Sequence, residues 1–193
     1  MKVFMKNRTF KEMFTGRKNV LDMLEQDHKE IMGLFKTFRK MTEEGAPPSE
    51  KDALVKKACA ALLLHTRLEE EIFYPAVRRA AGGNDMLDEA MVEHSQARAH
   101  IDELLEMLPG EALHDAKFIV LGEHIRNHIR EEEDQIFPMA EDYNVNLDAI
   151  GREMEKRRAE IEEEMGAAVF DEKSIPLVSA YEKTRMTDEG GIV

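Results

Sequence analysis

Apolar side chains recur along most of this chain at alternating steps of three and four residues. This spacing places them on one face of an α-helix. Turn-forming residues break the pattern at four short intervals, near residues 45–49, 82–84, 109–110 and 144–146. Between these breaks the pattern predicts four long amphipathic helices, at about residues 19–44, from an N-cap at Ser49 onward, 85–108 and 112–142.

Short connections between amphipathic helices make sequential neighbours antiparallel. We therefore predict an all-α fold, an up-down-up-down four-helix bundle, over residues 19–142. Residues 1–18 form a separate N-terminal segment. Residues 143–193 are expected to add a more polar helix at about 147–165 and then an irregular tail. This C-terminal region would lie over the bundle or over a partner, such as a second copy of the chain in a homodimer.

The composition restricts the cellular compartment and the kinds of partner that we expect for this protein. The 193-residue chain has a formal net charge of -13, which disfavours nucleic acid because the phosphate backbone would be repelled. Its apolar runs fall short of the ~18 residues of a membrane span, and its N-terminus lacks the apolar core of a secretory signal. A single cysteine, Cys59, excludes an internal disulfide framework. We therefore expect a cytoplasmic protein that binds neither nucleic acid nor membrane.

Each predicted bundle helix carries one histidine in its apolar stripe, where Leu or Ile would pack better. These residues are His28, His65, His94 and His128. A single core histidine is usually structural and is held by a hydrogen bond. Four imidazoles in one small core would each lose solvation, and a shared metal would compensate all of them at once. The set therefore indicates a metal site.

A glutamate follows two of these histidines by four residues, as Glu69 follows His65 and Glu132 follows His128. Residues four apart on a helix project from the same face, so both carboxylates are carried inward. Such a pair can chelate one ion, or its carboxylate can bridge two ions. The other acidic residues of the same two runs are expected to face solvent.

The chain also contains an internal repeat. A proline follows ten residues after His65 and ten residues after His128. An acidic residue, Asp27 or Glu93, precedes the histidine of the first and the third helix. The repeat predicts two helix pairs related by a pseudo-twofold axis, each supplying half of a dinuclear metal site.

The types of ligand restrict the metal. Imidazole and carboxylate without thiolate suit Fe, Mn or Zn and argue against Cu(I) and iron–sulfur clusters. Six side chains cannot saturate two six-coordinate ions, so open positions for a small molecule are expected. A ferritin-like site is the weaker alternative, because its Glu-x-x-His pair occurs once here, at Glu25 and His28.

Three further histidines need separate interpretation. His124 lies one turn before His128 and is a candidate additional ligand, although it could equally lie at the rim of the bundle. His100 and His114 are expected at the surface.

The histidine on each helix, the two His-x-x-x-Glu motifs and the prolines after them resemble the hemerythrin-like (HHE cation-binding) family over about residues 19–142. The resemblance implies a non-haem di-iron centre that cycles between Fe2+ and Fe3+ and engages O2, peroxide or NO. It implies terminal histidine ligands and bridging glutamates, at His28, His65, His94 and His128 and at Glu69 and Glu132, with room for a bridging oxo or hydroxo group.

Two positions differ from the oxygen-carrying hemerythrins. Those proteins place a second histidine on the third helix where this chain has Arg98, and their fourth-helix motif ends in Asp five residues after its histidine, whereas Glu132 follows at four. The chain is therefore more similar to hemerythrin-like proteins of iron repair, sensing or peroxide chemistry. Sensor or store, redox enzyme and iron donor stay open. So does an alternative of another class, a helical interaction module held together by structural zinc or another metal.

Overall fold

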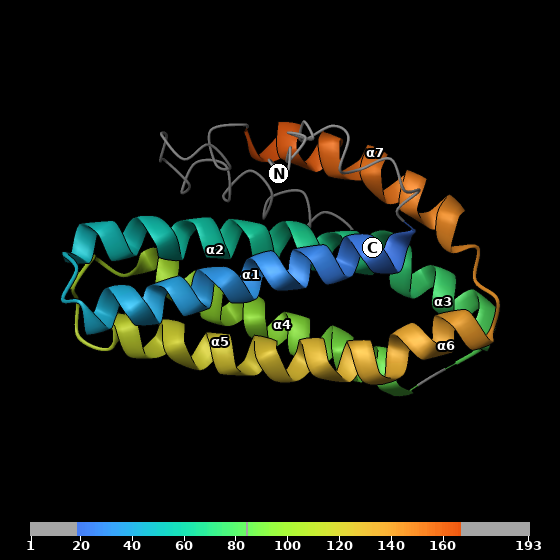
Figure 1. The fold of residues 1–193 in the computed structure, drawn as a ribbon, viewed down its shortest axis with the longest axis horizontal. Coiled ribbons are helices and arrows are strands. Elements are labelled where there is room, and N and C mark those ends of the chain that lie inside the picture. Colours follow the sequence, from blue (N-terminus) through green and yellow to red (C-terminus); the bar gives the residue numbers. More distant parts are fainter. Residues whose placement is uncertain (1–18, 84, 167–193) are drawn as a thin grey trace, which may run out of the picture.

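The computed structural model describes residues 19–83 and 85–166, which are helical without any strand (Figure 1). The bundle consists of α1 (Val20–Glu43), α2 (Pro48–Leu68), α4 (Asp85–Glu106) and α5 (His114–Glu131), with short continuations of α2 and α5. Neighbours in the chain pack antiparallel, and α1 also packs on α5, which closes the ring of helices. This confirms the predicted four-helix bundle. Residues 1–18 and the predicted irregular tail beyond residue 166 lie outside the described part of the chain.

The helix ends follow local chemistry. The Asn19 side chain accepts the Asp22 N–H while the Asp22 carboxylate accepts the Asn19 N–H, which forms a capping box at the start of α1. The predicted N-cap at Ser49 is wrong, because α2 begins one residue earlier at Pro48 and Pro47 occupies the cap position. Proline suits the first turn of a helix, where its missing N–H would have had no helical partner. Of the helices described, none combines the length and apolar character needed to cross a bilayer.

Two of the bundle helices, α2 and α5, each continue into one wider, π-helical turn. These turns are η2 (Glu69–Phe73), between α2 and α3 (Tyr74–Ala81), and η3 (Glu132–Ile136), between α5 and α6 (Phe137–Asp142). The carbonyl of the first residue of each turn accepts an N–H five residues later. A proline follows each turn, at Pro75 and Pro138; its ring would clash with the carbonyl four residues back in a regular α-helix. The wider turn relieves this clash, and it begins at Glu69 or Glu132.

The apolar interior falls into two clusters. One contains Leu24, Phe73 and Phe137, and the other contains Phe35 and Phe118 together with their neighbours. Along each helix the predicted histidine lies between residues of the two clusters. The polar layer is therefore enclosed by hydrocarbon on both sides along the bundle axis.

A further helix, α7 (Leu147–Met165), lies along the outside of α1 and α2 (Figure 1). Its bounds match the helix predicted for the C-terminal region. Ile150, Met154, Ile161 and Met165 recur on one face and join the first apolar cluster. Arg157 adds an ion pair to Glu71 of η2, with 2.6 Å between Nε and Oε2. This helix is thus packed on the bundle of its own chain.

Close packing of α5 on α1 gives a test of the fold at Gly122. A Cβ atom there would lie 2.7 Å from Cδ1 of Phe35, a buried ring that packs on Phe118 at 4.7 Å between ring centroids. Gly122→Ala is expected to lower the free energy of unfolding by about 1–3 kcal/mol, because the ring must shift against its neighbours. The measurement is urea unfolding of the metal-free protein followed by circular dichroism.

Gly33→Ala is the matched control, since Gly33 is exposed in α1 and an added Cβ meets nothing within 4 Å. Alanine favours the helix over glycine, so this variant should gain about 0.5–1 kcal/mol. Equal stabilisation by both substitutions would contradict the helix packing described here.

Candidate metal centre

Two carboxylates occupy the middle of the bundle. Glu69 is 0% exposed and Glu132 is 1% exposed, and each starts one of the two π-helical turns. Within the described chain, none of their four carboxylate oxygens has a hydrogen-bond partner. A carboxylate buried without a donor is costly, so this arrangement calls for a cation.

One group of possible ligands combines two histidines with both carboxylates. His28, His65, Glu69 and Glu132 each present one ligand atom within 4.8 Å of the others. His28 Nε2 lies 3.2 Å from Glu132 Oε2, and His65 Nε2 lies 3.2 Å from Glu69 Oε1. Neither Nε2 atom has a hydrogen-bond partner among the residues described.

A second group shares Glu69 with the first. It consists of Glu69, His94 and His128, again with ligand atoms within 4.8 Å. His94 Nε2 lies 3.4 Å from Glu69 Oε2 and 3.0 Å from His128 Nε2. Glu69 thus turns one oxygen toward each group, which is the geometry of a bridging carboxylate.

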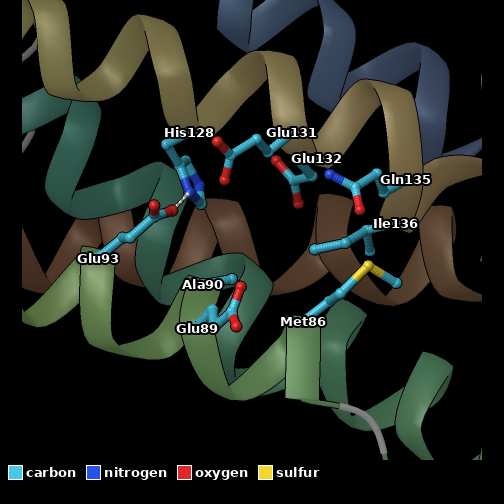
Figure 2. Close-up of a pocket in the computed structure, with 9 residues that line it drawn as sticks. All are labelled: Met86, Glu89, Ala90, Glu93, His128, Glu131, Glu132, Gln135 and Ile136. Atoms are coloured by element: carbon cyan, nitrogen blue, oxygen red, sulfur yellow. Dashed lines mark hydrogen bonds and ion pairs between the residues drawn. The ribbon is translucent and has the colours of Figure 1, made fainter.

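An outer carboxylate faces the Nδ1 atom of each of these histidines. The pairs are His28 with Glu133 (2.7 Å), His65 with Asp27 (3.5 Å), His94 with Glu70 (2.8 Å) and His128 with Glu93 (2.8 Å). Figure 2 shows the last of these contacts. An Nδ1–H that points to a carboxylate fixes the ring and leaves the Nε2 lone pair for a metal.

A family model matches nearly the whole of the four-helix bundle. The family model for the Hemerythrin HHE cation binding domain covers residues 19–140. This chain belongs to the hemerythrin HHE cation-binding family. The structure of this HHE domain is similar to the crystal structure of a Hemerythrin HHE cation binding domain-containing protein from Mycobacterium kansasii. The TM-score is 0.63 at 23% identity, and the match covers 79% of this chain and 98% of that one.

A curated relative matches over a smaller share of its own length. It is a protein from Nostoc sp. described as a DNA nickase, and it is 24% identical to the HHE chain over 119 residues. The match covers 62% of this chain and 32% of the relative. The chain thus spans about a third of the length of that relative.

Two of the four outer carboxylates of the HHE domain cross between its two repeats, whereas Asp27 and Glu93 contact a histidine of their own repeat. Glu70 follows Glu69 in the first repeat and contacts His94 in the second, whereas Glu133 follows Glu132 in the second repeat and contacts His28 in the first. The sequence analysis assigned Glu70 and Glu133 to a solvated face. The adjacent acidic residue in both His-x-x-x-Glu motifs was the signal that could have identified them.

Arginines extend this network outward. Arg98 donates to Glu70 with 2.5 Å between Nη1 and Oε1, at the position where oxygen carriers would have a histidine. Arg158 of α7 donates to Asp27, which faces His65. The C-terminal helix therefore contacts the partner of a histidine in the centre.

An aromatic ring covers one histidine of each ligand group, and the two rings differ in chemistry. Phe137 stacks on His28 with ring centroids 5.9 Å apart, and Tyr74 stacks on His94 at 5.5 Å. The Tyr74 hydroxyl lies 3.4 Å from His94 Nε2. Burial, followed by the nearby charge of Glu69, raises the pKa of Tyr74, so the hydroxyl keeps its proton at neutral pH.

The remaining histidines lie outside the two ligand groups. His124 is exposed and stacks on the half-buried His100, with ring centroids 5.2 Å apart. The structure therefore does not bring His124 to the centre. His114 was expected at the surface, but it is 1% exposed and lies 3.9 Å from Asp52, measured from Nε2 to Oδ1. His114 lies one turn before Phe118 in the apolar stripe of α5. This position in the stripe was the sequence signal for its burial.

Burial gives the ligand groups of the metal-free HHE domain unusual proton affinities. Burial and the neighbouring Glu132 raise the pKa of Glu69. Burial also lowers the pKa of His65 to about 4. For Glu132, burial opposes ionisation, but the positive charges of nearby histidines, with His28 Nε2 only 3.2 Å away, outweigh it and lower the pKa to about 2. The centre therefore favours neutral His65 and ionised Glu132, the forms that bind metals.

The raised pKa of Glu69 predicts a pH-dependent cost in the metal-free protein. The ionised carboxylate is disfavoured only in the folded state, so stability falls as the pH rises above the ordinary carboxyl value through the raised one. Glu69→Gln removes this cost. Its free energy of unfolding should exceed that of the wild type by about 1–3 kcal/mol more at pH ~8 than at pH ~5.

Urea unfolding in the presence of a chelator measures this difference. Glu153→Gln on the exposed face of α7 is the control and should show the same difference at both pH values. A Glu69→Gln advantage that shrinks as the pH rises would mean that Glu69 is not held in its protonated form by burial.

Proposed function

We propose that this HHE domain binds two non-haem iron ions between α1, α2, α4 and α5 and presents them to O2, peroxide or NO. The proposal rests on one observation: two groups of buried ligand atoms share the carboxylate of Glu69. The donor set supports it, since imidazole and carboxylate without thiolate suit iron, and the oxygens of both glutamates have no hydrogen-bond partner among the described residues.

The ligand roles follow from the distances. His28 and His65 would hold one ion, and His94 and His128 would hold the other. Glu69, which belongs to both groups, would bridge the two ions through its two oxygens. Glu132 belongs to the group of His28 and His65 and lines the same pocket as His128, so we propose it as the second bridge. When bound, iron supplies the ferrous–ferric redox chemistry, with coordination positions left open for a small molecule.

The surrounding residues control that chemistry. The outer carboxylates orient the histidines, and the apolar clusters on both sides limit access of water. Tyr74 holds a protonated hydroxyl next to His94, where it can donate a hydrogen bond to a small molecule in the centre. Phe137, which covers His28, offers no such donor. We therefore expect a small molecule to bind on the His94 side.

The DNA nickase activity named for the Nostoc relative is not part of the proposed function. The chain covers 32% of that relative, and its net charge of -13 is unfavourable for a phosphate backbone. Peroxide or iron oxidation, sensing and iron donation are functions that the proposed centre could serve in the cytoplasm.

The deciding measurement is metal content together with the absorption spectrum before and after addition of peroxide. We expect two irons per chain after anaerobic loading, and near-ultraviolet and visible absorption once oxidised. Sustained loss of peroxide would indicate an enzyme, whereas a structural change without turnover would indicate a sensor. A colourless protein with one zinc and no iron after aerobic loading would instead favour an interaction module with a structural metal.

Glu132→Ala tests the bridging assignment. The variant should lose most of the second iron, because one bridging carboxylate is missing, whereas His100→Ala outside the ligand groups should keep both. Metal analysis and the oxidised spectrum report the result. Two irons and an unchanged spectrum in Glu132→Ala would show that Glu132 does not bridge.

Asp27→Asn tests the outer carboxylates. Loss of the charge that faces His65 Nδ1 should weaken iron binding by about 10- to 100-fold. Competition with a chromogenic chelator measures the affinity, and Glu25→Gln on the exposed face of the same helix is the control. Equal affinities for Asp27→Asn and the wild type would remove Asp27 from the proposed centre.

A further inference from the structure

A small pocket opens between α4 and η3 and extends to the proposed centre (Figure 2). Its inner wall includes His128 and Glu132, and three further carboxylates line it, those of Glu89, Glu93 and Glu131. The free volume is about 30 Å³, which is room for about two water molecules. The pocket thus admits an ion or a molecule of a few atoms.

The carboxylates form a path from the surface inward. Glu89 and Glu131 are exposed, Glu93 is half-buried, and Glu132 at the inner end is 1% exposed. Figure 2 shows these side chains around the pocket. Both oxygens of Glu132 lack a hydrogen-bond partner in the described part of the chain, so the path ends at a buried carboxylate that can accept a cation.

The internal repeat shows what the equivalent groove in the first half contains. Aligning His28 with His94 and His65 with His128 places Met23 opposite Glu89, Leu68 opposite Glu131, and Ile72 opposite Gln135. The structure supports this alignment, because Asp27 faces His65 as Glu93 faces His128. The groove between α1 and η2 is therefore apolar where the groove between α4 and η3 is acidic.

The C-terminal helix covers that apolar groove. Met23, Leu68 and Ile72 are at most 8% exposed and belong to the same cluster as Met154 and Ile161 of α7. Arg158 of α7 also pairs with Asp27, the counterpart of the pocket residue Glu93. Figure 1 shows α7 on this side of the bundle, away from α4. The two halves thus share their ligands but differ in access.

We propose that the acidic pocket between α4 and η3 is the entrance through which divalent metal cations reach the centre. Glu89 and Glu131 capture the ion at the surface, and α7 closes the equivalent entrance of the first half. A cleft lined by charges of one sign raises the local concentration of the opposite ion and its rate of association. This inference rests on the proposed metal-binding function.

The test is the rate at which the full chain, stripped of metal, takes up Fe2+ under anaerobic conditions. A chromogenic chelator added at set times traps the Fe2+ that is still free. The Glu89→Gln, Glu131→Gln double variant should load about three- to tenfold more slowly at low salt, because two capturing charges are lost. The deficit should shrink at ~0.5 M salt, and the final iron content should equal that of the wild type.

The Glu153→Gln, Glu155→Gln double variant is the matched control. It removes the same charge from exposed positions on α7 and should load at the wild-type rate. A wild-type rate for the Glu89, Glu131 variant, or an equal slowing of the α7 control, would overturn the entrance. A wild-type chain that takes up no Fe2+ would instead overturn the proposed function, so the two failures are distinguishable.

Discussion

The burial of two carboxylates without hydrogen-bond donors is the constraint on which this structure depends. Glu69 and Glu132 lie at the centre of the bundle, where an uncompensated negative charge would oppose folding. Imidazole nitrogens from four helices converge on these two carboxylates. The outer carboxylates orient each imidazole so that the lone pair of its Nε2 atom points inward. A metal bound by this centre would couple its binding to folding, because the cation would compensate the buried charge.

The helices position these ligands by combining two periodicities. The regular α-helical stripe places each histidine between the two apolar clusters, which fixes the rings by packing. The wider turns then start at Glu69 and Glu132, ahead of Pro75 and Pro138, so the helix geometry changes where the carboxylates leave the backbone. Each π-helical turn thus begins at the glutamate that lies in the centre and is followed by the proline that disturbs the helix.

The internal repeat accounts for the symmetry of the ligands, and the packing of α7 on one side breaks that symmetry. The two helix pairs carry matching histidines, glutamates and outer carboxylates, yet one groove is apolar and covered while the other is acidic and open. Tyr74 on one side and Phe137 on the other add a second difference. The two repeats therefore form a centre that α7 covers on the α1 side and that is open at the pocket between α4 and η3.

The pattern of residues along the chain is sufficient to predict the helices, the bundle and the six side chains that face inward. These are local properties, because residues three or four apart share a face in any α-helix. The spacing between His65 and Glu69 therefore brings the two side chains together whatever the helix packs against. The same logic gave the bounds of α7 from its own periodicity, without saying what it covers.

Other features depend on contacts between helices and are seen only in the folded structure. Glu133 faces His28 across 105 residues of chain, and its place next to Glu132 in the sequence does not say which histidine it contacts. His124 follows the correct spacing but lies at the edge of its stripe and stacks on His100, while His114 at the helix start is buried. The rotation of a helix against its neighbours settles such positions. Periodicity identifies the buried face of a helix, but only packing against the other helices fixes where its edges and ends lie.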